Sequence, residues 1–426
     1  MTASLPAGHR FEALDADRLR DVLVLDTWAF PSPAPLDDFP ADAFPLAWDR
    51  TVGVVAPDAR DGELAAMYSS YPFRAFPVPG ATTAAGGLTW VGVHPQHRRR
   101  GILTAMIDAH LAECAARGEA FSALFAAEHA IYGRFGYGRA ADDLRLEIPR
   151  GAALRDVPGA DAHTVRVELA SREAHGDLVD RVHRRAGLGV GGVNRPGWVS
   201  RETAGLQAAF WDDSPLRRAG RETQRVVVVE RDGEPRGYAR LRRKLDWETA
   251  GPRGRVDTGE VVALDAAAAR ALWGVLLDLD LTSVVAPFVL PVDDVVTHLL
   301  VDRRAALPRV ADNLWVRLVD APAALAARQY AADVDVVLAL GDERLPANTG
   351  TWHLRAPAFA PATCSRTDAA PDLELDVREL GAAYLGGTSL AALAASGLVT
   401  ERTPGALARA AAAFAWPLAP GCSWIF

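Results

Sequence analysis

Residues 88–118 change from a strand-like to a helix-like pattern across a short basic turn. Residues 88–93 are an apolar run with β-branched and aromatic side chains, which predicts a buried strand. From residue 101 onward, apolar side chains recur every three or four positions, which predicts a helix that buries one face and ends near Gly118. The turn between strand and helix carries Arg98, Arg99 and Arg100 directly before Gly101.

The position of these arginines favours an anion at the start of the helix. The first N–H groups of a helix have no internal partners, and the helix dipole makes that end positive. Three arginines add like charge there, and a bound pyrophosphate would accept both the free N–H groups and the guanidinium donors. Gly101 would let the backbone approach such an anion closely. The alternative is a solvated basic turn.

The strand, basic turn and helix together resemble the signature of the GNAT N-acetyltransferase superfamily. Arg98, Gly101 and Leu103 follow its Gln/Arg-x-x-Gly-x-Gly/Ala motif, with Leu103 in place of the small residue. The resemblance implies acetyl-CoA as cofactor, with the pantetheine arm at Val91 and Val93 and the pyrophosphate at residues 99–104. The expected cofactor-binding residues are Val91, Gly92, Val93, Arg98, Arg99, Arg100, Gly101, Ile102, Leu103, Thr104, Ala127 and Glu128.

A second motif makes the resemblance more specific. Residues 131–138 read Ile-Tyr-Gly-Arg-Phe-Gly-Tyr-Gly, and with residues 97–101 they resemble the enhanced intracellular survival (Eis) acetyltransferases. This resemblance implies an α+β fold: two tandem GNAT-type domains, then a sterol carrier protein-like α/β domain, in a homohexamer. We expect a catalytic domain over residues 1–152, a degenerate GNAT domain over 153–308 and the third domain over 309–426, and 426 residues suit three domains.

The resemblance also assigns a general acid. In the superfamily, a tyrosine at the position of Tyr132 faces the sulfur of the leaving coenzyme. A phenol with its usual pKa of about 10 is protonated at neutral pH and can donate a proton to a departing thiolate. Tyr137 is the competing candidate, and core packing of both tyrosines is the alternative without chemistry.

The last residues form an apolar tail with one strong charge. After Arg409 the only ionisable side chain is that of Cys422, and the tail ends in Trp424, Ile425 and Phe426. Such a tail draws the terminal carboxylate of Phe426 toward buried surroundings, which makes a carboxylate a stronger base. In the Eis family this carboxylate helps to deprotonate the substrate amine. Without the resemblance, the sequence of the tail favours a C-terminal strand whose final residue only packs against the rest of the protein.

The resemblance places the substrate beside the first helix. Eis proteins use this region to wall the substrate cleft, and here a loop rich in Pro and Asp covers residues 31–45. An aspartate could hold an ammonium group and aromatic rings could cover it. Our substrate-binding candidates are Asp26, Trp28, Phe30 and Trp90. The implied substrates are primary amines of aminoglycosides, polyamines or lysine side chains.

The second domain repeats the order of strands and helix but not the basic loop. Residues 264–267 read Leu-Asp-Ala-Ala where the first domain has its arginines. Asp265 would repel phosphate and would itself cap the helix that follows. We therefore expect a structural GNAT copy that does not bind coenzyme A.

Composition narrows the class of protein. The formal net charge of −8 argues against a nucleic-acid partner. Cys114, Cys364 and Cys422 are widely spaced, so neither a disulfide framework nor a zinc site is expected. The sequence shows neither a signal peptide nor an apolar stretch of about 20 residues, and we expect a cytoplasmic protein without a membrane contact. The alternative function is a non-catalytic lipid- or acyl-CoA-binding protein that uses the third domain.

Overall fold

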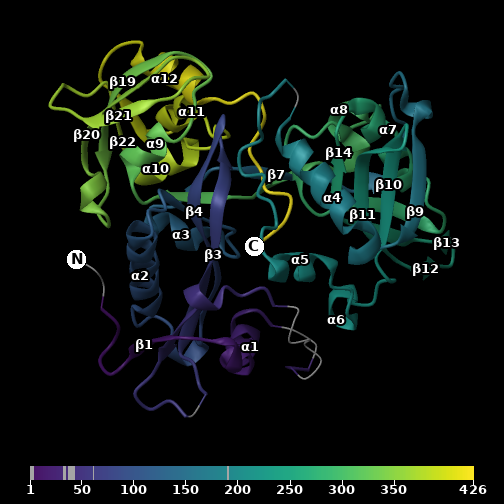
Figure 1. Ribbon diagram of the computed structural model, residues 1–426, viewed down its shortest axis with the longest axis horizontal. Helices are drawn as coiled ribbons and strands as arrows, with labels where there is room; N and C mark the ends of the chain where they lie inside the picture. Colours follow the sequence, from purple (N-terminus) through teal and green to yellow (C-terminus); the bar gives the residue numbers. More distant parts are fainter. Residues whose placement is uncertain (1–3, 32–34, 37–43, 61, 190) are drawn as a thin grey trace.

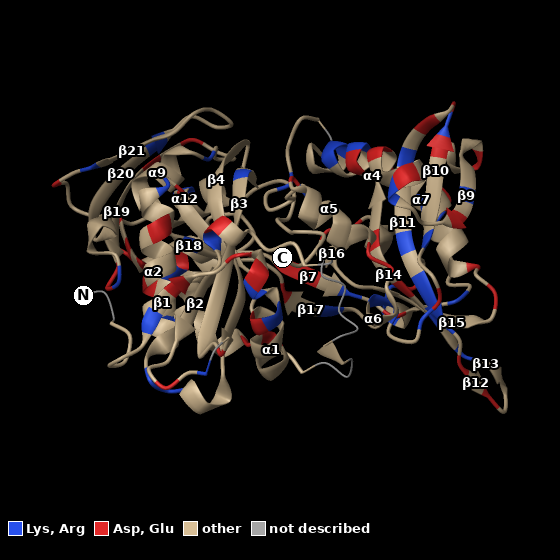
Figure 2. Cartoon of the chain, turned by 60° about the horizontal axis from the view of Figure 1, so that its bottom comes forward, with Lys and Arg blue, Asp and Glu red and all other residues tan. Residues whose placement is uncertain are grey.

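Three lobes meet around the C-terminus in the computed structural model of the chain (Figure 1). The structure describes residues 4–31, 35–36, 44–60, 62–189 and 191–426. The C-terminus lies between the two halves of the molecule in this view and again after a rotation of 60° (Figure 2).

The first lobe is built on a mixed sheet. Over the described residues its seven strands run in the order β1-β2-β3-β4-β5-β18-β6. They are β1 (Arg10–Ala13), β2 (Val52–Val55), β3 (Ala66–Val78), β4 (Ala81–Val93), β5 (Phe121–Leu124), β18 (Trp315–Leu318) and β6 (Gly138–Arg139). Helices α1 (Leu19–Ala29) and α2 (Ile102–Ala116) cover opposite faces, because α1 packs with Met67 and α2 with its neighbour Tyr68.

The second lobe repeats this plan. Its six strands, within the described part of the chain, run in the order β8-β15-β14-β11-β10-β9. They are β8 (Ile148–Pro149), β15 (Thr282–Pro287), β14 (Gly254–Ala263), β11 (Glu234–Lys244), β10 (Arg225–Arg231) and β9 (Thr164–Leu169). Helix α4 (Arg172–Gly187) packs with Val226 and Val228, whereas α7 (Ala266–Leu277) packs with Val227 and Val229 on the other face. Shorter elements are α5 (Ala204–Trp211), α6 (Pro215–Arg218), α8 (Val296–Leu299), β12 (Trp247–Glu248) and β13 (Gly251–Pro252).

The first two lobes exchange strands. Strand β18 follows the second lobe in sequence but lies between β5 and β6 of the first sheet, while β8 follows the first lobe and pairs with β15 of the second. Between the lobes, β7 (Asp142–Arg145) pairs with β16 (Leu290–Pro291) and β17 (Arg309–Asp312). Residues 309–318, which we expected at the start of the third domain, thus supply one strand between the lobes and one strand of the first sheet, where the buried Val316 and Leu318 hold β18 in place.

The third lobe is a sheet in the order β21-β20-β19-β22-β23, packed with helices. The strands are β21 (Thr363–Arg366), β20 (Gly350–Ala356), β19 (Val334–Gly341), β22 (Leu373–Asp376) and β23 (Val399–Glu401), and the helices are α9 (Ala321–Ala326), α10 (Val377–Ala383), α11 (Leu390–Ala395) and α12 (Ala406–Phe414). Helix α10 lies so close to β6 that a Cβ atom at Gly138 would stand 2.0 Å from the carbonyl oxygen of Arg378. A glycine at this position therefore lets the third lobe dock on the first.

Within the described residues, no helix combines the length and the apolar character needed to span a bilayer.

Candidate active site

Strands β4 and β5 part from each other and open a cavity. They pair in parallel only where Ala85, Gly86 and Gly87 face residues 121–123. Beyond this point a cavity of about 740 Å³ opens between Val91, Gly92 and Val93 on β4 and Ala127 and Glu128 after β5. Backbone groups that would pair within a continuous sheet are therefore left for a ligand.

A bulge in β4 turns the backbone at the edge of this cavity. Thr89 pairs with Ser69 and Gly92 with Met67, so Trp90 and Val91 face the single residue Tyr68. Trp90 has a φ of +53°, in the left-handed region that large residues rarely adopt. Such a bulge leaves the groups of one residue outside the ladder and re-aims its neighbours.

The basic turn presents free N–H groups at the start of α2. The helix begins with the hydrogen bond from Ala105 N–H to the Gly101 carbonyl, at 3.1 Å. The N–H groups of residues 102–104 lie ahead of this bond and have no helical acceptor. Arg99 and Gly101 have φ values of +62° and +85°. Arg98 and Arg99 line the cavity, and in the described part of the chain neither forms an ion pair. This donor set fits a pyrophosphate.

The cavity gathers the expected cofactor residues with one exception. Val91, Gly92, Val93, Arg98, Arg99, Gly101, Ile102, Leu103, Thr104, Ala127 and Glu128 all line it. Arg100 lies instead in a separate pocket beside Asp58 and Glu63. The left-handed backbone on both sides of Arg100, at residues 99 and 101, accounts for this divergence.

The two candidate tyrosines have different surroundings. Tyr132, in α3 (His129–Tyr132), lines the cavity, and its hydroxyl forms no hydrogen bond with any described residue. Burial and the charge of Glu128 raise the pKa of Tyr132 to about 12, so it stays protonated at neutral pH. The Tyr137 hydroxyl lies 2.8 Å from Ser122 Oγ in the core. Only Tyr132 is available to a ligand in this cavity.

The C-terminal residue reaches the end of β5. The Phe426 ring lies 4.8 Å from the Phe73 ring and 5.1 Å from the Phe125 ring, measured between centroids. Phe125 directly follows β5 and stands two residues before Ala127 in the cavity wall. The chain end thus lies beside the parted strands.

The expected substrate-side residues do not form one cluster. Phe30 lines the cavity, whereas Trp28 is 55% exposed, with its ring 5.1 Å from that of His94. The Trp90 indole contacts the hydroxyl of Tyr71, on the side of Phe426.

Asp26 does not line the cavity, but its side chain is partly buried, and this changes the pKa of its carboxyl. Burial raises the pKa of its carboxyl to about 6. Most of the Pro- and Asp-rich segment 31–45 lies outside the described residues.

Known protein families match all three lobes. Residues 11–140 match an acetyltransferase (GNAT) domain model, residues 197–318 a second such model, and residues 321–423 a sterol carrier protein domain model. The chain is 43% identical to an uncharacterized N-acetyltransferase of Streptomyces avermitilis, over 87% of this chain and 88% of the relative. It is 33% identical to the N-acetyltransferase Eis of Mycobacterium tuberculosis, over 79% of this chain and 80% of the relative. The chain belongs to the Eis family of GNAT acetyltransferases.

A solved structure of the Eis family agrees with this assignment. The crystal structure of Eis1 from Mycobacterium abscessus superimposes with a TM-score of 0.78 at 31% identity, covering 98% of this chain and 100% of that one. The predicted α+β fold, with two GNAT domains followed by a sterol carrier protein-like domain, is therefore confirmed. The Eis family also confirms the prediction of an N-acetyltransferase, and members of the GNAT superfamily use acetyl-CoA.

The second GNAT domain of this Eis-family chain lacks the donor set of the first. At the start of α7, the Asp265 carboxylate accepts a hydrogen bond from Ala268 N–H at 2.9 Å and pairs with Arg236. Its negative charge occupies the place where a phosphate would bind, which supports a structural role for this domain.

Several residues of the cavity were not among those predicted from the sequence. Ala29, His97, Ile131, Arg134, Phe135 and Arg344 also line the cavity. Residues 131–135 belong to the motif that resembles the Eis family, so the sequence indicated this segment. Arg344 comes from the third domain, and no pattern around it indicates a ligand.

Proposed function

We propose that the cavity between β4 and β5 binds acetyl-CoA and that the enzyme acetylates primary amines of aminoglycosides, polyamines or lysine side chains. One observation carries the proposal: the first residues of α2, Tyr132 and two arginines that form no ion pair with any described residue all line one cavity. Acetyl-CoA supplies a thioester whose thiolate is the leaving group.

The proposed cofactor-binding residues lie in two places, at the start of α2 and at the end of β4. Residues 102–104 and the side chains of Arg98 and Arg99 would hold the pyrophosphate. The backbone at Val91 and Val93 would hold the pantetheine arm, and N–H groups near Val91 would polarise the thioester carbonyl. Holding thioester and amine together makes their reaction effectively unimolecular.

Two groups would move the protons. The Phe426 carboxylate would accept a proton from the substrate ammonium, directly or through water, and Tyr132 would donate a proton to the thiolate. Proximity of Phe426 to Phe125 supports the first role, and the position of Tyr132 in the cavity wall supports the second. Asp26, Phe30 and Trp90 remain the proposed substrate contacts, with Trp28 at their edge.

An acetylation assay tests the proposal. Release of free thiol is followed with acetyl-CoA and a panel of kanamycin, spermine and a lysine peptide. Turnover with at least one amine supports the function, and no turnover with any of them contradicts it. The alternative of a lipid carrier accounts for neither the anion-binding turn nor Tyr132.

We further propose that the enzyme works in the cytoplasm as a homohexamer, following the family resemblance. Light scattering coupled to size exclusion measures the assembly directly, and a mass of one or two chains would contradict it.

A further inference from the structure

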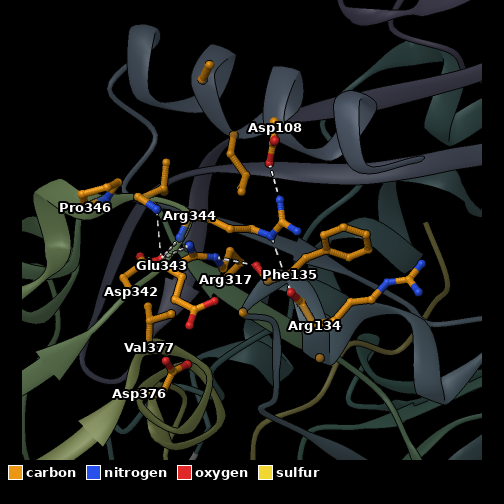
Figure 3. Close-up of a pocket in the computed structure, with 15 residues that line it drawn as sticks. Asp108, Arg134, Phe135, Arg317, Asp342, Glu343, Arg344, Pro346, Asp376 and Val377 are labelled. Atoms are coloured by element: carbon orange, nitrogen blue, oxygen red, sulfur yellow. Dashed lines mark hydrogen bonds and ion pairs between the residues drawn. The ribbon is translucent and has the colours of Figure 1, made fainter. Parts of the chain in front are cut away.

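One arginine of the third lobe reaches into the cavity of the first. Arg344 follows β19 and lines the same cavity as Arg99 and Tyr132. Its Nη1 donates to Asp108 Oδ1 on α2 at 2.7 Å, and its guanidinium lies 4.7 Å from the centre of the Phe135 ring (Figure 3). The guanidinium of Arg134 lies 4.9 Å from the same ring. Two cations therefore flank one aromatic side chain of the cavity wall.

A buried ion pair fixes both sides of this arrangement. Arg317 on β18 forms a bidentate pair with Asp342, at 2.7 and 2.9 Å. Asp342 Oδ1 also accepts from the N–H groups of Arg344, at 3.1 Å, and Leu345, at 3.0 Å. Arg317 Nε donates to the Phe135 carbonyl at 2.8 Å (Figure 3). The backbone on both sides of the contact between Arg344 and Phe135 is thus held by one network.

These cations lie away from the pyrophosphate turn. Asp108, the partner of Arg344, stands six residues after Ile102, which corresponds to about 9 Å along the helix axis. Among the described residues that line the cavity, Glu128 is the only acid, and Arg134 forms no ion pair. The cavity therefore holds its cations in two separate groups, and the second group also borders the pocket of Figure 3, which is lined by Asp108, Asp342 and Glu343.

We propose that Arg344 and Arg134 bind the 3′-phosphate of coenzyme A, so that the third domain completes the cofactor site. This inference rests on the proposed function. A phosphate dianion accepts several charge-assisted hydrogen bonds, and guanidinium groups match its geometry. Asp108 and the Phe135 ring orient the Arg344 side chain, and Asp108 neutralises only part of the combined charge.

Binding of coenzyme A and 3′-dephospho-coenzyme A to the full-length protein separates this subsite from the rest of the cavity. Isothermal titration calorimetry compares wild type, Arg344→Gln and Arg134→Gln. Wild type is expected to bind coenzyme A about tenfold more tightly than the dephospho form. Each variant should lose most of this preference, while its affinity for the dephospho form stays the same. The control Arg117→Gln, which removes an arginine directly after α2 that pairs with Glu113 outside the cavity, should keep the preference.

The outcomes distinguish this inference from the proposed function. A variant that binds both ligands less well by the same factor, or that keeps the full preference, overturns the subsite. A wild type that binds both ligands equally also overturns it but leaves the proposed function intact. A wild type that binds neither overturns the proposed function itself. Thermal unfolding of each variant shows whether it is folded, and the two arginines provide independent tests.

Discussion

The Ser423 hydroxyl lies 2.6 Å from Glu260 Oε1 and donates to it, which anchors the C-terminal tail in the second GNAT domain. His183 Nε2 lies 3.0 Å from the same hydroxyl. Because the hydroxyl hydrogen goes to Glu260, His183 Nε2 must carry the hydrogen of this second contact. Nearby, the Trp424 indole donates to the Val199 carbonyl at 2.8 Å. The domain that lacks a cofactor turn thus holds the residues that precede Phe426.

Ser423→Ala is expected to lower the acetylation rate without changing the affinity for coenzyme A. Loss of the hydroxyl leaves His183 and Glu260 short of one partner each, which costs about 1–3 kcal/mol and loosens the tail. Steady-state kinetics should show a lower kcat, and calorimetry should show unchanged coenzyme A binding. Ser396→Ala is the matched control, because the hydroxyl of this exposed serine donates to the Ala392 carbonyl of its own helix at 3.0 Å, far from the tail in sequence. Equal rates for both variants would show that the anchor does not position the tail.

The same cluster should make the protein less stable in mild acid. Burial lowers the pKa of His183 to about 4. For Glu260, burial alone would raise the pKa, but the charges of Arg201, His183 and Arg240 outweigh it and hold the pKa at about 2. An unfolded chain then binds more protons than the native one below pH ~6.5, so stability falls as the pH falls. His183 contributes up to about 3 kcal/mol of this loss between pH ~6.5 and ~4.

Chemical denaturation between pH 7.5 and 4.5 measures this slope. His183→Gln should give a shallower slope than wild type, because glutamine does not titrate. Some slope should remain, since burial also lowers the pKa of His110, to about 3. If the free energy of unfolding falls with pH equally in the variant and in wild type, the assignment to His183 is wrong.

Tyr132→Phe is expected to slow acetyl transfer by about 10²–10³-fold, because it removes the proposed proton donor. Tyr137→Phe is the matched control. Its hydroxyl contacts Ser122 in the core, so this change should lower stability by about 1 kcal/mol and leave the rate per folded enzyme nearly unchanged. Rates and unfolding curves of both variants check the prediction, and a normal rate for Tyr132→Phe would remove it from the mechanism.

Replacing neighbouring arginines of the basic turn should change the KM for acetyl-CoA to different extents. Arg99→Gln is expected to raise the KM for acetyl-CoA about tenfold, because it removes a charged donor from the cavity. Arg100→Gln should change the KM less than about twofold, since Arg100 lies in the pocket with Asp58. A larger increase of the KM for Arg100→Gln than for Arg99→Gln would contradict the placement of these two arginines.

Local patterns predicted much of the fold. The helix predicted directly after Asp265, with Asp265 as its cap, corresponds to α7 and its capping hydrogen bond. The strand, turn and helix of residues 88–118 correspond to β4 and α2. Both cases rest on periodicity and caps, which depend on residues close in the sequence.

Long-range pairing was not predictable in the same way. The mostly apolar residues of β18 indicate a strand but not its partner, so its place beside β5 followed from no sequence pattern. Arg344 reaches the cavity only because the third lobe docks on the first. Gly136 and Gly138 offered an indirect signal, because a Cβ atom at either would collide with Arg317 or with Arg378. Gly138 marks the close contact between the first and third lobes, and Gly136 marks the place of β18 in the first sheet.

The role of the terminal carboxylate is tested most directly by replacing it with a carboxamide. Protein ligation can supply a chain that ends in Phe426 amide and keeps every side chain. The account predicts unchanged coenzyme A affinity and an acetyl-transfer rate at least about 100-fold lower, because the general base is lost while the cofactor site is intact. An amidated enzyme that acetylates amines at the wild-type rate would contradict the account.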